Sequence, residues 1–285
     1  PFVAPKKYFN LYDREKIKIP ESSSQYLATL PEPAAKSIRA KKNQLNLEKE
    51  RAQEIKEAYY ATISFVDAQV GRLLDQLEAS GLDENTVVVF TSDHGYHMGE
   101  HGHWQKQTLF ENATRIPLII SAPNSENKGV ISMSPVELID LYPTLMDLTD
   151  INTPQHVVGK SLEPLMKNVN ASIRGSALTK WRNGYSIKTK RYRLTKWGSN
   201  GELGYELYDH KNDMNELINL ATNQDYNEVL DSLKLVIEQR INEASIKPEG
   251  LGRQFENAKP IPKAGNITFG DIHDANGKRT YLKKK

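Results

Sequence analysis

The histidines of the chain are concentrated in one polar segment, residues 92–106. Four of the seven histidines lie within ten residues there, and the charged side chains beside them are Asp93, Glu100 and Lys106. Carboxylate oxygens suit hard divalent cations, imidazoles bind metals and transfer protons, and a lysine can stabilise negative charge. The segment could therefore hold a metal ion or a substrate.

Other interpretations of this segment remain open on the residues alone. Asp93 could simply cap the turn that follows it, which is a common role for a single aspartate after a strand. A zinc site is conceivable by ligand type, although the spacing lacks the two-histidine helical motif of metalloproteases. Its ligands would be His94, His97, His101 and His103.

A predicted strand and helix place this segment at an edge of a sheet. Residues 86–91 form a continuous β-branched run, which is typical of a strand buried on both faces. Before it, apolar residues recur at helical spacing from about Leu47 to Leu77, and Gly81 is a suitable helix terminator. Helix followed by buried strand predicts an α/β fold with a mostly parallel central sheet. Ligands bind at the carboxyl ends of strands in such sheets, where residues 92–106 begin.

The rest of the chain predicts a second, smaller unit. Residues 1–45 lack periodicity and predict an extended segment, and residues 134–137 predict the start of a further helix. Three runs near residues 185–189, 192–197 and 206–210 predict a small antiparallel sheet. A helix over about 226–244 would pack across it. We therefore expect an α/β domain over 1–165, an antiparallel-sheet subdomain over 166–245, and an extended tail or linker over 246–285.

Composition excludes several classes of protein. The 285 residues contain 38 Lys and Arg against 36 Asp and Glu, so no overall charge favours nucleic acid. No apolar run is long enough for a membrane span. Cysteine is absent, which excludes disulfides and thiolate chemistry. The chain starts at Pro1-Phe2 without a signal-peptide pattern, so we expect any export signal to lie outside this sequence.

Motifs spread over most of the chain occur in the order found in one enzyme family. The central match runs from Thr91-Ser92-Asp93-His94-Gly95 through Gly99-Glu100-His101-Gly102 to Trp104 and Lys106. Flanking matches are Tyr59-Tyr60-Ala61, Val66-Asp67, Val70-Gly71, Arg115-Ile116-Pro117-Leu118, the run ELIDLYPTL at residues 137–145, Gly159-Lys160-Ser161-Leu162, Glu206-Leu207-Tyr208-Asp209 and Asn219-Leu220-Ala221. Over about residues 1–240 the sequence resembles the C-terminal portion of formylglycine-dependent sulfatases of the alkaline-phosphatase-like superfamily, and it is most similar to the iduronate-2-sulfatase and choline-sulfatase branch.

The resemblance implies a function and roles for individual residues. It implies hydrolysis of a sulfate ester on a carbohydrate, in a periplasmic, secreted or lysosome-like compartment. Asp93 would bind Ca²⁺, His94 would be the next metal ligand or contact the sulfate, and Lys106 would bind the sulfate and assist the leaving oxygen. His94 and Lys106 are thus the candidate catalytic residues. Substrate contacts beside Lys106 would come from Tyr96, Met98, His101, His103 and Trp104.

Part of the family's site is missing from these residues. The formylglycine arises from a Cys/Ser-x-Pro/Ala-x-Arg motif, and the nearest run, Ser121-Ala122-Pro123-Asn124-Ser125, ends in Ser instead of Arg. No Asp-Asp pair is present, and the family's catalytic histidine would lie just before Pro1-Phe2. We therefore expect an N-terminal portion of the enzyme as a partner. The alternatives are a phosphatase or phosphonate hydrolase of the same superfamily, or an inactive carbohydrate-binding fragment.

Overall fold

The structure is a computed structural model that describes residues 2–20, 24–39, 44, 47–123, 125 and 127–246, together with the backbone of 272–273 and 279–280. The chain forms two units, residues 1–246 and 247–285. In the second unit, β7 (Ile272–His273) and β8 (Arg279–Thr280) pair antiparallel. The rest of the predicted tail lies outside the described residues. The predicted boundary at residue 165 stays a prediction.

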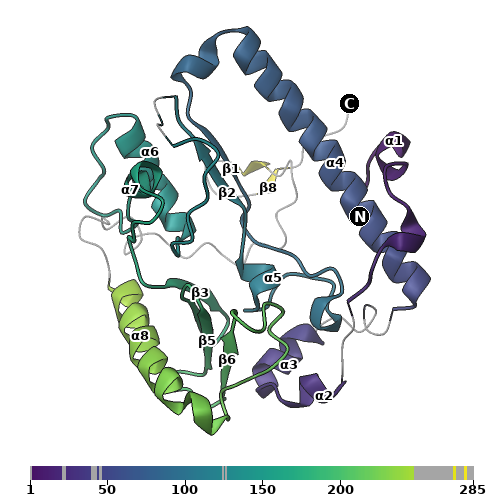
Figure 1. The fold of residues 1–285 in the computed structure, drawn as a ribbon, viewed down its shortest axis with the longest axis vertical. Helices are drawn as coiled ribbons and strands as arrows, with labels where there is room; N and C mark the ends of the chain where they lie inside the picture. Colours follow the sequence, from purple (N-terminus) through teal and green to yellow (C-terminus); the bar gives the residue numbers. More distant parts are fainter. Residues whose placement is uncertain are drawn as a thin grey trace. The chain divides into compact units, whose positions relative to one another are not determined.

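The predicted long helix is confirmed as α4 (Lys49–Ala79), and it leads through η3 (Leu82–Asn85) into β1 (Val88–Thr91) (Figure 1). Gly81 ends the helix in the left-handed region, with φ 68°, which glycine adopts without strain. β1 pairs with β2 (Leu118–Ser121), so that Thr91 lies opposite Leu118.

The α/β class is confirmed, but parallel pairing is wrong for these two strands, because they run antiparallel. A parallel pair needs a crossover connection, whereas the chain between β1 and β2 returns through a loop and two short helices, η4 (Glu100–Gly102) and α5 (Glu111–Thr114). Burial of the strand on both faces is also wrong, since Phe90 is 44% exposed.

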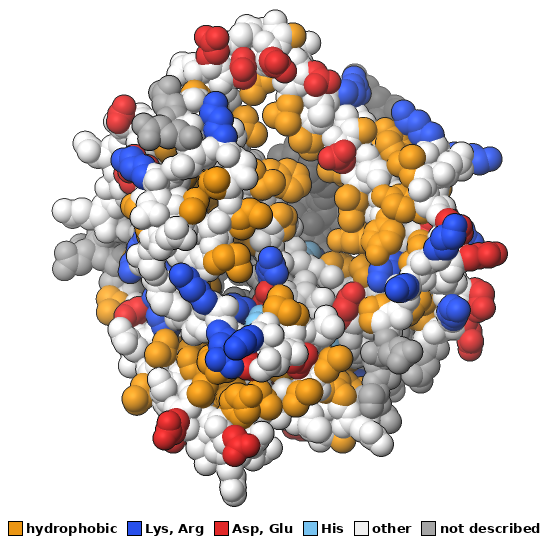
Figure 2. Space-filling view, in the orientation of Figure 1, with side chains coloured by type: hydrophobic (Ala, Val, Ile, Leu, Met, Phe, Trp, Pro, Cys, Tyr) orange, Lys and Arg blue, Asp and Glu red, His pale blue; other side chains and the backbone are white. Residues whose placement is uncertain are grey.

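An apolar surface covers one side of α4 and the β1–β2 pair. The large hydrophobic side chains exposed there are Ile63, Val66, Leu73, Leu74, Phe90 and Ile119. Figure 2 shows hydrophobic side chains gathered over these elements. We call this group the apolar α4–β face. Contiguous exposed apolar patches are typical of surfaces that contact another protein, a membrane or a ligand.

Short helices replace the extended segment predicted for residues 1–45. They are α1 (Lys6–Phe9), η1 (Arg14–Lys16), α2 (Ser24–Ala28) and α3 (Glu32–Ile38). Each is too short to show apolar periodicity, which is why the sequence did not reveal them. Further along the chain lie η4 (Glu100–Gly102), α5 (Glu111–Thr114), η5 (Leu138–Asp140), α6 (Leu141–Leu148) and α7 (Glu163–Lys167). The helix predicted at residue 134 thus begins later, where Glu137 and Asp140 form the capping box.

The predicted antiparallel sheet is confirmed and has four strands in the order β3-β4-β5-β6. They are β3 (Ala177–Trp181), β4 (Gly184–Lys188), β5 (Tyr192–Trp197) and β6 (Tyr205–Asp209). The chain then passes through η6 (Gln224–Tyr226) into α8 (Asn227–Ser245), which packs on one face of the sheet (Figure 1). Trp197 and Tyr208 contact α2, α3 and Phe110 on the other face. The sheet is therefore buried on both sides, and residues 109–110 join it to the polar segment.

Among the described residues, no helix combines the length and the hydrophobicity needed to cross a membrane.

Candidate functional site

The polar segment folds back on itself beyond the end of β1. The N–H of His97 donates to the carbonyl of Gln105 (2.8 Å), and the N–H of Gly99 donates to the carbonyl of His103 (2.9 Å). These two backbone bonds bring the end of the segment back to its beginning. Lys106 therefore lies beside His94, although twelve positions separate them in the sequence.

Three predicted residues come together at this point. The Nζ of Lys106 lies 2.7 Å from Nε2 of His94, and Oδ2 of Asp93 lies 3.5 Å from the same nitrogen. The Nδ1 of His94 lies 2.8 Å from the carbonyl of Gly95, so Nδ1–H donates to that carbonyl and Nε2 accepts a hydrogen bond from Lys106. The side chain of Asp93 is 83% exposed and that of His94 is 34% exposed. A neutral imidazole therefore holds a lysine ammonium at an open surface.

Asp93 suits a hard divalent cation better than His94 does. Its carboxylate is open, and oxygen is the ligand that Ca²⁺ prefers. The Nε2 of His94 already accepts a hydrogen bond from Lys106, so its lone pair is engaged in this arrangement. Calcium takes six to eight oxygens, and Asp93 would supply one or two of them. Asp93 can therefore supply part of the ligand set of a calcium ion, at one edge of the site.

Most of the other predicted substrate contacts lie inside the loop. Met98, His101, His103 and Trp104 are all buried. The ring of His101 stacks on Phe110 with centroids 4.1 Å apart, and Nδ1 of His103 lies 2.9 Å from the carbonyl of Ile38. These contacts give the four residues packing roles, and their role in substrate binding stays a prediction.

The four-histidine zinc arrangement does not assemble. His97, His101 and His103 pack against one another with ring centroids 5.0 to 5.5 Å apart, whereas His94 contacts Lys106. The Nε2 of His97 lies 2.8 Å from Oγ1 of Thr108. Burial lowers the pKa of His97 well below its ordinary value and that of His101 to about 4, so both are neutral packing groups near neutral pH.

Tyr96 and Trp104 border a cavity of about 230 Å³. Its other walls include Phe2, Arg51 and Ile55. The hydroxyl of Tyr96 donates to the carbonyl of Trp104 (3.2 Å), which fixes the phenol ring against the cavity. Aromatic walls suit the face of a sugar ring, whereas the guanidinium of Arg51 is paired with Glu54.

Gly95 lies against the short helix α5 with no room for a side chain. Its N–H donates to the carbonyl of Ala113 (2.8 Å), and a Cβ at residue 95 would lie 2.0 Å from the carbonyl oxygen of Asn112. The backbone next to His94 is thus fixed by α5. The glycine itself is the only signal of this contact in the sequence.

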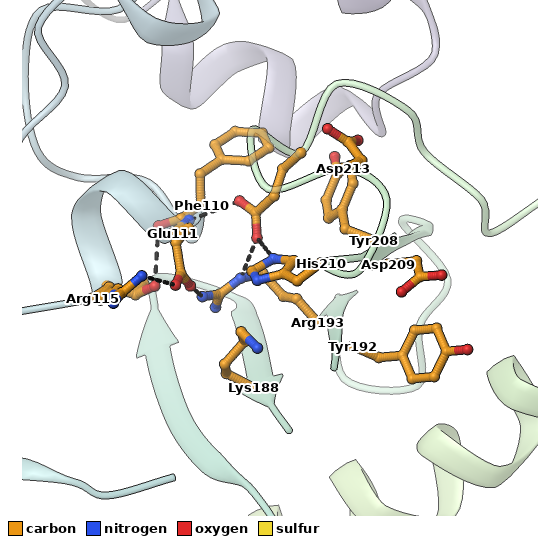
Figure 3. Close-up of polar contacts among 12 residues, drawn as sticks. Phe110, Glu111, Arg115, Lys188, Tyr192, Arg193, Tyr208, Asp209, His210 and Asp213 are labelled. Carbon is orange, nitrogen blue, oxygen red and sulfur yellow. Dashed lines mark hydrogen bonds and ion pairs between the residues drawn. The ribbon is translucent and has the colours of Figure 1, made fainter. Parts of the chain in front are cut away.

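A buried ion-pair cluster lies where α5 meets the antiparallel sheet. Figure 3 shows Glu111, Arg193 and His210 converging from α5, β5 and the end of β6. The guanidinium of Arg193 pairs with Glu111 and Glu216, and Nε2 of His210 lies 2.7 Å from Oε1 of Glu216. Ligand atoms of Glu111, His210 and Glu216 lie within 4.8 Å of one another, so by residue type they could hold a cation. Sequence reasoning missed this cluster, although a charged residue facing inward on a strand was a signal for it.

Two family models match the chain. One is described as Sulfatase and covers residues 5–151, and the other is described as N-sulphoglucosamine sulphohydrolase, C-terminal, and covers residues 99–243. The chain belongs to the sulfatase family. The triad of Asp93, His94 and Lys106 lies within the part of this sulfatase chain that the first model matches.

Individual relatives agree with this family. The sulfatase chain is 34% identical over 242 residues to a protein named Sulfatase from Formosa agariphila, covering 83% of this chain and 47% of that one. It is 30% identical over 198 residues to an N-acetylglucosamine-6-O-sulfatase from Bacteroides thetaiotaomicron, covering 64% of this chain and 34% of that one. The chain therefore spans half or less of the length of these two relatives.

A solved structure shows the same fold. The phosphonate monoester hydrolase SpPMH from Silicibacter pomeroyi superposes with a TM-score of 0.76 at 24% identity, over 85% of this chain and 54% of that one. The likeness places the chain in the alkaline-phosphatase-like fold that its motifs indicated.

Proposed function

We propose that this chain forms one side of the active site of a sulfuric ester hydrolase acting on a sulfated carbohydrate. The observation that carries the proposal is the contact between Lys106 and His94 beside an open carboxylate. A lysine ammonium has three N–H donors, and His94 occupies one of them. The remaining two can bind the oxygens of a sulfate group and stabilise charge on the departing oxygen.

His94 orients the lysine. Its Nδ1 proton is committed to the carbonyl of Gly95, so the tautomer that accepts from Lys106 is the favoured one. Asp93 would supply oxygen to a calcium ion, and a divalent cation bound there would polarise the sulfate oxygens. The further calcium ligands and the formylglycine nucleophile would come from outside these 285 residues.

The carbohydrate class of the substrate rests on two supports. One relative is named an N-acetylglucosamine-6-O-sulfatase, which acts on a sulfated sugar by its name. The cavity bordered by Tyr96 and Trp104 has aromatic walls, which suit the face of a sugar ring. We further propose, from its membership of the sulfatase family, that this enzyme works in a periplasmic, secreted or lysosome-like compartment.

The partner of this chain would be the remaining portion of the sulfatase polypeptide. The apolar α4–β face is the surface that it would cover, because Leu73 and Ile119 are 69% and 61% exposed. No nucleic-acid or membrane partner is proposed.

Hydrolysis of 4-nitrophenyl sulfate and 4-nitrophenyl phosphate by the complete protein tests the function. We expect the sulfate ester to be the better substrate and its hydrolysis to need a divalent cation. The fold shared with a phosphonate monoester hydrolase makes phosphonate or phosphate ester hydrolysis the second candidate. A preference for the phosphate ester would favour that candidate, and loss of both activities would favour an inactive carbohydrate-binding protein.

A further inference from the structure

We infer that Arg193 is a positioning residue for the Asp93, His94 and Lys106 site, which it reaches through Glu111, α5 and Gly95. The inference rests on the proposed function. It gives the antiparallel sheet a part in catalysis, although none of its side chains contacts the three site residues in any described interaction.

The first link is the ion pair between Arg193 and the start of α5. The side chain of Arg193 is only 2% exposed. Its Nε donates to Oε1 of Glu216 (2.6 Å), its Nη1 donates to Oγ of Ser186 (3.1 Å), and its Nη2 pairs with Glu111, the first residue of α5. A buried guanidinium with several directed hydrogen bonds fixes its partners more tightly than an exposed ion pair does.

The second link fixes the backbone of α5. Oε2 of Glu216 accepts the N–H of Glu111 (2.7 Å), so the same carboxylate that binds Arg193 also holds the start of the helix. Glu216 adopts φ 55°, a left-handed conformation that is strained for a non-glycine residue. Its contacts with Arg193, the N–H of Glu111 and His210 hold the side chain in place despite this strain.

The third link joins α5 to the site. The carbonyl of Ala113 accepts the N–H of Gly95, and Gly95 is the neighbour of His94. Because Gly95 touches Asn112 with no spare space, a movement of α5 moves the backbone that carries His94. Interiors are close-packed and transmit such displacements.

The buried cluster of Arg193, Glu111, Glu216 and His210 is a set of ion pairs and not a metal site, and we call it the Arg193 latch. Both carboxylate oxygens of Glu216 are already engaged, Oε1 by Arg193 and His210 and Oε2 by Glu111 N–H. Burial by itself raises the pKa of Glu216, but the charge of Arg193 and the hydrogen bonds outweigh it and hold the pKa below its ordinary value. A cation would have to displace Arg193 from the carboxylates that neutralise it.

The test compares matched arginine variants in the complete protein. Arg193→Lys keeps the charge but loses the fork of donors. Arg191→Lys is the control, because Arg191 makes a similar two-bond contact with Asp209 just before β5 and has no hydrogen bond or ion pair with α5 among the described residues. Glu111→Gln is the second latch variant, should Arg193→Lys fail to fold. Hydrogen exchange at the Gly95 amide and the separate kcat and KM for an aryl sulfate are measured for each.

We expect both latch variants to exchange the Gly95 amide about tenfold faster and to lower kcat about tenfold with little change in KM, while Arg191→Lys changes neither. Latch variants that lose thermal stability but keep wild-type exchange at Gly95 and wild-type kcat per folded molecule would overturn the inference. If the wild-type protein hydrolyses no sulfate ester but Gly95 exchange still responds to the latch, the proposed function fails and the mechanical coupling stands.

Discussion

Gly95→Ala perturbs the position of the site without removing any of its functional groups. The added Cβ would lie 2.0 Å from the carbonyl oxygen of Asn112 and 3.0 Å from that of Arg115. Both obstacles are backbone atoms, so no side chain can rotate away. Ordinary contact begins near 3.4 Å, and the two backbones must therefore separate by about 1.4 Å.

That separation acts directly on His94. A displacement of about 1 Å in a catalytic group costs about 10²-fold in rate, equivalent to about 2.7 kcal/mol of transition-state stabilisation. Overpacking of this kind also costs about 1–3 kcal/mol of folding stability. We therefore expect Gly95→Ala to remain folded but to lower kcat/KM for an aryl sulfate about 10²-fold.

Gly71→Ala is the matched control. Gly71 lies inside α4, and a Cβ there meets nothing within 4 Å. Alanine in a helix interior is more favourable than glycine by about 0.5–1 kcal/mol, so this variant should be as active as the wild type and slightly more stable. Steady-state kinetics and thermal unfolding of both variants provide the comparison. A folded Gly95→Ala protein with kcat/KM within about threefold of wild type would refute the positional role of α5.

Two further predictions concern charge. Lys106→Ala should lower kcat for sulfate ester hydrolysis about 10²-fold or more. The loss should be larger for a sugar sulfate than for 4-nitrophenyl sulfate, because the poorer leaving group depends more on the ammonium. Equal rates for variant and wild type would show that Lys106 is a surface lysine without a catalytic role. Burial lowers the pKa of His101 to about 4 from an ordinary 6.5, so the unfolded chain binds a proton that the folded chain rejects as the pH falls between these values. The free energy of unfolding of the wild type should fall by up to about 3 kcal/mol over this window. In urea unfolding at about pH 7.5 and 4.5, His101→Asn should show a smaller fall than the wild type. Identical falls for both proteins would contradict the burial of a neutral His101 ring.

Much of the fold could be predicted because its elements carry periodic patterns. The helix over 49–79, three strands of the antiparallel sheet and the helix over 227–245 all follow runs with clear 3.6- or 2-residue periods. β3 was missed, and the short helices before residue 39 carry too few residues for any period. The pairing of β1 was mispredicted because strand direction depends on how the following loop returns, which the apolar run itself does not encode.

The candidate site also has a part that could be predicted from the sequence and a part that could not. Asp93, His94 and Lys106 were predicted from motif order, and the structure brings them together. Burial of His101 and Trp104 was not predicted, because aromatic and imidazole side chains serve equally well in a core or on a binding surface. The Arg193 latch joins residues from positions 111 to 216, and long-range ion pairs of this kind leave no local pattern in a sequence.

Calcium binding by the complete protein with Asp93→Asn tests the central claim most directly. The account predicts that this substitution weakens calcium binding by about 10-fold or more in a calorimetric titration, because a neutral amide replaces the carboxylate ligand. Asp75→Asn, at an exposed position on α4, should bind calcium as the wild type does. A wild-type binding isotherm for Asp93→Asn would contradict the placement of the cation at the edge of β1.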